Sequence, residues 1–121
     1  MAQHRMLAYL SLALIAALGF SAALSGCRTK GLPDSFAQCL TQNGAAMYGT
    51  DWCPHCQSQK KLFGESFQYI NYTDCDYNKE TCDARNITGY PTWYIGGKPY
   101  EGEQTAQELS LRTDCELASQ P

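Results

Sequence analysis

The stretch Trp52-Cys53-Pro54-His55-Cys56 follows a short apolar segment and opens a segment with helical character. Two cysteines three positions apart in the first turn of a helix can bond to each other as a reversible disulfide. Unsatisfied backbone N–H groups at the start of the helix favour a thiolate on Cys53, and a protonated or hydrogen-bonding His55 favours it further. We therefore predict that Cys53 is the nucleophile of thiol exchange, that Cys56 is the resolving thiol, and that Pro54 and His55 support them.

Two other interpretations of this cysteine pair stay open at this point. A zinc or copper site would need more ligands, and the chain offers one other histidine, His4, and no second Cys-x-x-Cys motif. A structural disulfide would leave the pair chemically inert. We expect neither a metal nor a cofactor at this site.

The segments on either side of the motif alternate between helical and extended patterns. Helices are predicted over residues 35–42, 53–63 and 79–86, and from 105 towards 115. Strands are predicted over residues 45–48, 67–75, 92–95 and 98–101. Ser35 is the expected cap of the first helix, Thr105 and Glu108 form a capping box, and Gly96-Gly97 is the turn of a hairpin. This order predicts a small α/β sandwich in which a parallel crossover joins the first two strands.

A second motif, Gly89-Tyr90-Pro91-Thr92, opens one of the predicted strands. Together with the Trp-Cys-x-x-Cys turn it resembles the thioredoxin superfamily. The resemblance implies a three-layer sandwich with a small mixed four-stranded sheet, helices on both faces and an additional N-terminal helix. It also implies that Pro91 is a cis-proline packed against the active-site sulfurs, and that the backbone of Tyr90 pairs with an extended substrate chain. An ordinary turn proline is the alternative for Pro91.

The resemblance narrows to the thioredoxin-like domain fused to bacterial vitamin K epoxide reductase homologues, over residues 36–115. It is carried by Met47-Tyr48-Gly49, the Trp52–Cys56 motif, Lys61-Leu62-Phe63-Gly64 and Gly89-Tyr90-Pro91-Thr92-Trp93. In those fusions the domain exchanges electrons between secreted substrate proteins and a quinone-coupled membrane unit of four helices. The resemblance therefore implies protein thiols or disulfides as substrates. It also implies a quinone-linked, disulfide-generating membrane protein as redox partner, which we expect to be encoded separately.

The chain departs from typical thioredoxins at two places. Met47 stands where thioredoxins carry a buried acid that assists proton transfer at the resolving thiol, so Cys56 would need water or another group, such as an inward-folded Asp51. Pro54 and His55 replace the Gly-Pro of reducing thioredoxins, and Pro-His also occurs in the periplasmic oxidase family. Stabilising the thiolate of the nucleophile makes the disulfide more oxidising. We therefore predict an oxidant, with a disulfide reductase and a non-catalytic binding or metal-carrier module as alternatives.

Aromatic and basic residues around the two motifs have simple expected roles. Trp52 and Tyr90 flank the predicted site and are the candidates for contact with unfolded substrate, although either could belong to the core. Trp93 is expected in the core. Lys60-Lys61 is most simply a solvated helix face.

All seven cysteines of the 121-residue chain follow residue 26, and the chain contains no valine. A small cysteine-rich domain with few aliphatic residues is typical of an oxidising compartment. Two structural disulfides are predicted, Cys39 with Cys115 and Cys75 with Cys82. Pairing of Cys39 with Cys75 or Cys82 stays open, as does a second redox pair formed by Cys75 and Cys82.

The first 26 residues have the pattern of a secretory signal, with His4 and Arg5 before a long apolar run. The run closes on Leu24-Ser25-Gly26-Cys27, which resembles the lipobox of bacterial lipoproteins and implies that the sulfur of Cys27 receives diacylglycerol. Cleavage by ordinary signal peptidase and an uncleaved membrane anchor are the alternatives. All three place the protein outside the cytoplasm.

These patterns divide the chain into a signal peptide over residues 1–26, a tether over 27–34 and a thioredoxin-like domain over 35–117. We expect a lipid-anchored monomer in a bacterial cell envelope, facing the periplasm or the cell exterior. The formal net charge is −3, and the lysines and arginines form no basic stripe, which argues against a nucleic-acid partner.

Overall fold

A computed structural model describes residues 31–117 of the chain. The predicted signal peptide and the lipidation site Cys27 lie outside the described residues. None of the helices within residues 31–117 is long and apolar enough to cross a membrane.

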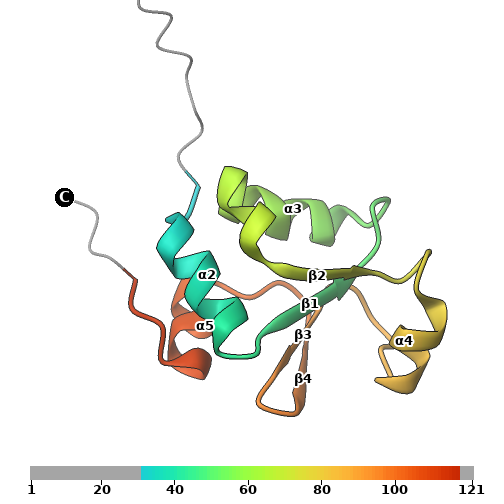
Figure 1. The fold of residues 1–121 in the computed structure, drawn as a ribbon. Helices are drawn as coiled ribbons and strands as arrows, with labels where there is room; N and C mark the ends of the chain where they lie inside the picture. The colour runs from blue at the N-terminus through green and yellow to red at the C-terminus, as the bar shows by residue number, and fades with distance from the viewer. Residues whose placement is uncertain (1–30, 118–121) are drawn as a thin grey trace, which may run out of the picture.

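The helices and strands follow one another in the order predicted from the sequence, with one short 3-10 helix added (Figure 1). The helices are α2 (Asp34–Gln42), α3 (Pro54–Phe63), the 3-10 helix η1 (Gly64–Tyr69), α4 (Lys79–Ala84) and α5 (Ala106–Thr113). The strands are β1 (Ala46–Gly49), β2 (Asn71–Asp74), β3 (Thr92–Ile95) and β4 (Lys98–Glu101).

The strands form one mixed sheet in the order β2-β1-β3-β4. β1 runs parallel to β2, with Gly49 opposite Asp74, and α3 lies in the crossover that joins them. β3 runs antiparallel to both β1 and β4. The carboxyl end of β1 leads directly into the turn before α3, which places the Cys-x-x-Cys motif at the end of an inner strand of the sheet.

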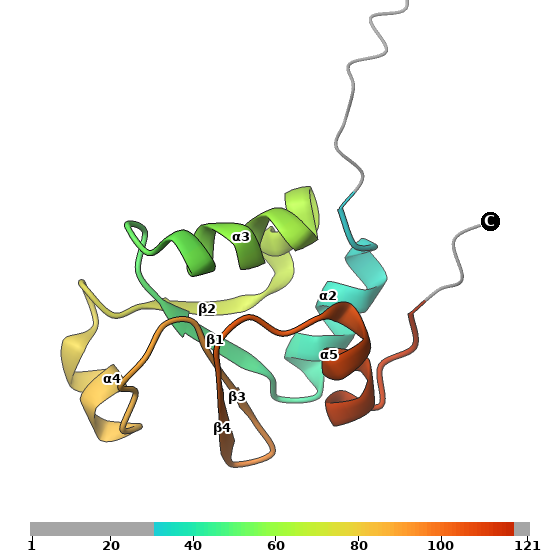
Figure 2. The same ribbon diagram turned by 180° about the vertical axis from the view of Figure 1, so that it is seen from behind.

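The sheet carries helices on both of its faces, as the sequence predicted. Met47 and Trp93 are cross-strand partners whose side chains join a core cluster with residues of α2, α3 and α5. Tyr48 points to the other face, where it lies in a smaller cluster with Cys82 of α4 and with Ile87. Figures 1 and 2 show α3 along one face and α2 beside α5 at one end of the molecule. The predicted α/β sandwich with a mixed four-stranded sheet is confirmed.

Two local predictions are wrong. The first helix begins at Asp34, its N-cap is Pro33, and no side chain caps it, so Ser35 is a residue of the helix itself. The strand predicted over residues 67–75 is confined to Asn71–Asp74, because Gly64–Tyr69 forms the 3-10 helix η1. The aromatic residues of that segment suggested a strand, but Phe67 is half-buried and packs against the rings of Phe63 and Tyr72, and such packing overrides β propensity.

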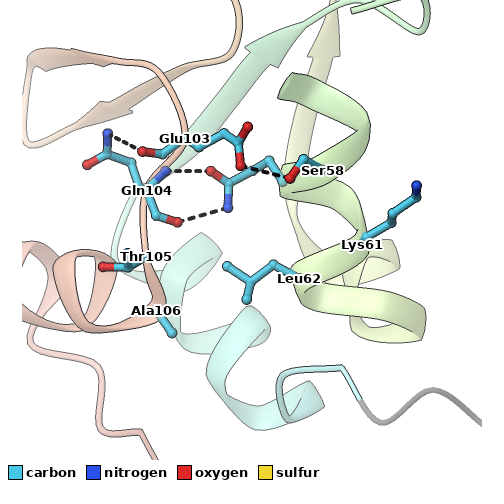
Figure 3. A pocket seen from close by; sticks show the side chains of 8 residues that line it. Ser58, Lys61, Leu62, Glu103, Gln104, Thr105 and Ala106 are labelled. Carbon is cyan, nitrogen blue, oxygen red and sulfur yellow. Dashed lines mark hydrogen bonds between the residues drawn. The ribbon is translucent and has the colours of Figure 1, made fainter. Parts of the chain in front are cut away.

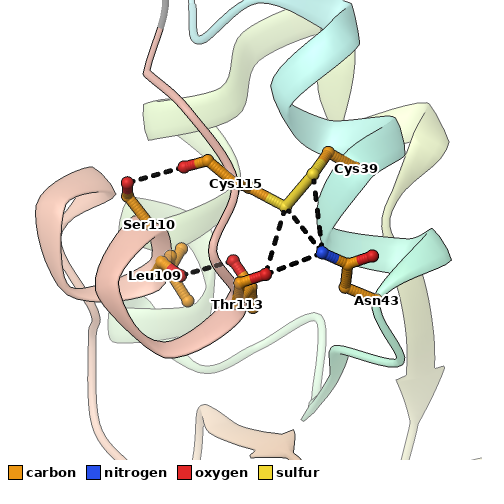
Figure 4. Close-up of a disulfide and its surroundings, with 6 residues drawn as sticks. All are labelled: Cys39, Asn43, Leu109, Ser110, Thr113 and Cys115. Carbon is orange, nitrogen blue, oxygen red and sulfur yellow. Dashed lines mark hydrogen bonds between the residues drawn. A yellow bond between two sulfur atoms is a disulfide. The ribbon is translucent and has the colours of Figure 1, made fainter.

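Two disulfides tie the ends of these elements together. Cys39 of α2 is bonded to Cys115 just beyond α5, which joins the two ends of the described fold (Figure 4). Asn43 supports this bridge, since its Nδ2 donates to the carbonyl oxygen of Thr113 at 2.7 Å and lies 3.6 Å from the sulfur of Cys115. The second bridge, Cys75–Cys82, closes the connection between β2 and α4.

Candidate active site

Cys53 and Cys56 meet at the amino terminus of α3, and both are free thiols in the structure. Cys53 is the N-cap residue, and its sulfur accepts the backbone N–H of Cys56 at 3.3 Å. Pro54 is the first residue of the helix, a position where the missing N–H of proline costs nothing. The helix thus places a backbone donor against the sulfur that carries negative charge during thiol exchange.

Cys56 lies one turn deeper and is fully buried. Its sulfur packs against the backbone of β1 so closely that a Cβ atom added at Gly49 would lie 2.7 Å from it. Burial, and next the hydrogen bond with Cys53, raise the pKa of the Cys56 thiol to about 12. Cys56 is therefore a protonated thiol at neutral pH, and a negative charge on it during exchange needs compensation.

The loop before β3 faces the sulfur of Cys53. The Tyr90–Pro91 peptide bond is cis, Pro91 is buried, and the sulfur of Cys53 lies 3.6 Å from the carbonyl oxygen of Tyr90. Two further hydrogen bonds hold the loop, one from Gly102 N–H to the carbonyl oxygen of Pro91 and one from the hydroxyl of Thr92 to the carbonyl oxygen of Gly89. The two motifs quoted from the sequence, 37 positions apart at their contact, form one site.

The rings of Trp52 and Tyr90 pack together beside Cys53. Trp52 is 65% exposed, its ring meets that of Tyr90 edge-on at 6.2 Å, and its Nε1–H donates to Asp76 at 2.8 Å. Tyr77, which follows Asp76, is 85% exposed. The sequence suggested Trp52 and Tyr90 for substrate contact, and the structure places their rings against each other. Trp93 is fully buried, as expected for a core residue.

His55 is oriented by a carboxylate that the sequence did not point to. Its Nδ1 lies 2.7 Å from an oxygen of Glu103, whose other oxygen accepts the hydroxyl of Ser58 at 2.8 Å. The hydrogen bond with His55, and next that with Ser58, lower the pKa of the Glu103 carboxyl. No local pattern could reveal this contact, because Glu103 comes from the loop between β4 and α5.

The same loop is fixed to α3 beside a pocket of about 440 Å³ (Figure 3). Gln59 is buried, its Oε1 accepts the N–H of Gln104 at 2.7 Å, and its Nε2 donates to the carbonyl oxygen of Gln104 at 3.0 Å. Glu103 and Leu62 are among the residues that line the pocket. The side-chain amide of Gln59 thus fixes the backbone of Gln104 to α3, next to Glu103, whose carboxylate contacts His55.

Lys60 does not belong to a solvated helix face, which corrects the prediction for this residue. Its side chain is 25% exposed, and its ammonium lies 2.8 Å from a carboxylate oxygen of Asp51 and 4.1 Å above the ring of Tyr72. Lys61 is exposed as predicted. Asp51 does not fold inward, since its side chain is 73% exposed. Met47 is buried in the core, so no acid side chain stands at that position.

Within residues 31–117, no group of three or more histidine, cysteine, aspartate or glutamate side chains is arranged to hold a metal ion. The geometry instead brings together two thiols that can form a disulfide, a backbone carbonyl beside the first of them, and the rings of Trp52 and Tyr90 next to them. This arrangement suits exchange of a disulfide with a second polypeptide chain.

Known proteins with similar sequences catalyse related chemistry according to their names. The chain is 39% identical over 92 residues to thiol-disulfide oxidoreductase LTO1 of Arabidopsis thaliana, covering 69% of this chain and 24% of that protein. It is 32% identical over 101 residues to protein disulfide isomerase-like 2-1 of Oryza sativa subsp. japonica, covering 70% of this chain and 28% of that protein. The chain therefore spans less than a third of the length of these two relatives.

The other two comparisons contribute little. No protein-family model matches the chain. The solution structure of oxidised thioredoxin from Plasmodium falciparum superposes with a TM-score of 0.44 at 20% identity, covering 73% of this chain and 98% of that one. The features that define the family of this chain are the order and directions of its strands, the dithiol at the start of α3 facing the loop of Pro91, and the sequence relatives. By these features the chain belongs to the thioredoxin superfamily.

Proposed function

We propose that this protein is a thiol-disulfide oxidoreductase of the bacterial cell envelope that exchanges disulfides with secreted or periplasmic proteins through Cys53 and Cys56. The observation that carries the proposal is the pair of free thiols at the start of α3, with the sulfur of Cys53 beside the carbonyl of Tyr90. Relatives named for thiol-disulfide exchange and disulfide isomerisation support the reaction class.

In the oxidising direction the reaction begins with Cys53 and Cys56 joined as a disulfide. A substrate thiolate attacks the sulfur of Cys53, the bond between the two active-site sulfurs breaks, and Cys56 leaves as a thiolate. A second substrate thiolate then attacks the substrate sulfur of the mixed disulfide, which forms the substrate disulfide and releases the thiolate of Cys53. Two electrons have passed to the enzyme, and a disulfide of the redox partner accepts them when the pair is reoxidised.

We infer the oxidising direction from the Pro-His dipeptide and from the backbone donor at Cys53. Groups that stabilise negative charge on the nucleophile stabilise the reduced enzyme, and this makes its disulfide a stronger oxidant. The partner that fits this direction is a quinone-linked membrane protein of the vitamin K epoxide reductase type. The resemblance of the sequence to domains fused to such proteins supports this choice.

The proposed lipid anchor on Cys27 fits the position of the first described residues. The N–H of Leu32 donates to the carbonyl oxygen of Leu62 at 3.1 Å, at the carboxyl end of α3, whereas Cys53 lies at its amino end. A helix of 10 residues is about 15 Å long. An anchor attached before Leu32 would therefore leave the two thiols on the side of the domain that faces away from its attachment point.

Trapping of mixed disulfides tests the proposed reaction. In a Cys56→Ala variant the resolving thiol is absent, so Cys53 should accumulate mixed disulfides with envelope proteins, visible as bands that disappear on reduction. The matched control, Cys53→Ala with Cys56→Ala, should trap nothing. Absence of trapped protein in the single variant would refute the enzymatic role and leave a binding module.

The reduction potential of the pair tests the direction. Equilibration with glutathione of known redox state gives this potential, and a value near about −120 mV is that of a strong oxidant. A value near about −270 mV, as in thioredoxin, would instead make the protein a reductase.

A further inference from the structure

The resolving thiol Cys56 has an unusual set of ionisable neighbours. The buried acid expected for a thioredoxin is replaced by the core residue Met47. On α3 itself the ionisable neighbours of Cys56 are Cys53 and, one helical turn later, Lys60. Packed against this face of α3 are the turn that holds Asp51 and the strand β2 with Tyr72 and Asp74.

Lys60 is fixed in place by its own contacts. Its ammonium lies 2.8 Å from Asp51 and 4.1 Å above the ring of Tyr72. The Tyr72 ring in turn lies against the site of Cys56, because a Cβ atom at Gly49 would be 3.5 Å from Tyr72 Cε2 and 2.7 Å from the sulfur. The cation is thus held on the same side of α3 as the buried thiol.

We propose that Lys60 is the positioning residue of the resolving step, and that its ammonium compensates the negative charge that forms on the sulfur of Cys56 during disulfide exchange. This inference rests on the proposed function and concerns the same pair of thiols.

The other ionisable groups around Cys56 cannot supply this compensation. Asp51 and Asp74 are carboxylates and repel a thiolate, and the role of Asp51 is to hold the ammonium of Lys60. Burial, and next the charge of Asp74, raise the pKa of the Tyr72 hydroxyl far above its usual range, so Tyr72 stays neutral. The backbone of Thr50 lowers the pKa of Cys56 through a hydrogen bond, and Lys60 is the cation whose charge lowers it further.

The same charge forms in both directions of exchange. When the enzyme oxidises a substrate, the bond between Cys53 and Cys56 breaks, Cys56 leaves with the electron pair, and it later takes a proton from water. When the mixed disulfide is resolved, Cys56 gives its proton to water and attacks the sulfur of Cys53, and the substrate leaves as a thiolate. A nearby ammonium stabilises the thiolate of Cys56 in each case.

The pH dependence of Cys56 alkylation tests the proposal on the protein alone. All variants are made in the full chain carrying Cys53→Ala, and their labelling by iodoacetamide is measured between pH 8 and pH 11. Mass spectrometry follows the peptide that contains Cys56, so a thiol at Cys27 does not interfere. Lys60→Met should lower the labelling rate severalfold at a given pH, but by less than tenfold, because the charge of Lys60 is the weakest of the influences on the pKa of Cys56 and a factor of ten would correspond to a whole pKa unit. Lys60→Arg should restore most of the rate.

The matched control is Lys61→Met, which removes the same charge from the next, exposed position of the helix and should leave the pH profile unchanged. A shifted profile in Lys60→Met with an unchanged circular dichroism spectrum supports the proposal. If Lys60→Met and Lys61→Met give the same profile as the background, Lys60 has no role in the ionisation of Cys56. That result would leave the trapping experiment on Cys56→Ala untouched, so a failure of this inference is distinguishable from a failure of the proposed function.

Discussion

Replacement of Gly49 by alanine should damage both the stability and the chemistry of this protein. Gly49 is the last residue of β1, paired with Asp74 of β2, and its carbonyl oxygen accepts the N–H of Cys75 at 2.8 Å. A Cβ atom there would lie 2.7 Å from the sulfur of Cys56, whereas ordinary contacts begin at 3.4 Å. The sulfur must therefore move by about 0.7 Å or more, since the paired strand cannot yield.

The expected loss in the free energy of unfolding is about 1–3 kcal/mol, the usual cost of overpacking a buried site. Urea unfolding followed by tryptophan fluorescence measures it, with the midpoint shifted and the slope unchanged. The displaced thiol should also close the Cys53–Cys56 disulfide more slowly, and stopped-flow oxidation measures that rate.

Gly89→Ala is the matched control for Gly49→Ala. A Cβ atom at Gly89 would lie 3.5 Å or more from the carboxyl group of Glu101, an ordinary contact beside the same site. This variant should unfold within about 0.5 kcal/mol of the unmodified protein, as substitutions without a steric or polar fault usually do. Equal stability and equal oxidation rates in Gly49→Ala and Gly89→Ala would refute the argument from the close contact with Cys56.

Four further predictions concern other parts of the chain. Cys39→Ser with Cys115→Ser should lower the free energy of unfolding by about 4.5 kcal/mol, the value that the chain-entropy model gives for this long loop. For the short loop closed by Cys75 and Cys82 the same model gives about 2.5 kcal/mol, and a loss smaller than this value in the Cys39→Ser, Cys115→Ser variant would contradict the prediction. The hydrogen bond with His55 lowers the pKa of Glu103, so this contact should stabilise the fold at a pH above the ordinary pKa of a glutamate. The stabilisation should be lost as the pH falls through the lowered pKa of Glu103. In the Glu103→Gln variant the free energy of unfolding should therefore depend less on pH in the acid range. Trp52→Ala should slow exchange with a reduced unfolded protein more than exchange with glutathione, and equal slowing would remove Trp52 from substrate binding. Cys27→Ser should abolish labelling by a radioactive fatty acid, and persistent labelling would exclude lipidation at that cysteine.

The parts of the fold that local patterns determine were predictable from the sequence. The capping box of Thr105 and Glu108 forms as expected, and the hairpin strands at the Gly96-Gly97 turn have the predicted bounds. The segment 67–75 was predicted less well, because Phe67 packs against the core from a 3-10 helix, and the pattern of aromatic residues does not distinguish that arrangement from a strand.

In the functional site, too, the residues within local motifs were predictable from the sequence and the others were not. The dithiol and the Tyr90-Pro91 element were visible because each is a compact motif. Glu103 and Lys60 were not, since their roles depend on contacts that only the folded chain creates. Glu103 is 48 positions from His55, and Lys60 is distinguished from Lys61 by its direction on α3 and by its contact with Asp51.

Solvent exposure alone does not separate the reactive cysteines from the structural ones. Cys53 is 5% exposed, and so is Cys75, which is bonded to Cys82. The difference lies in the surroundings of the sulfur, because Cys53 has the backbone N–H of Cys56 and the carbonyl oxygen of Tyr90 beside it, whereas Cys75 and Cys82 are packed in an apolar cluster. Exchange requires an external thiolate to approach a sulfur in line with the bond that breaks, with the leaving sulfur stabilised as an anion. The proposed oxidoreductase has two further disulfides in its own fold, so it must confine this chemistry to one bond, and the start of α3 and the loop at Pro91 distinguish that bond from the others.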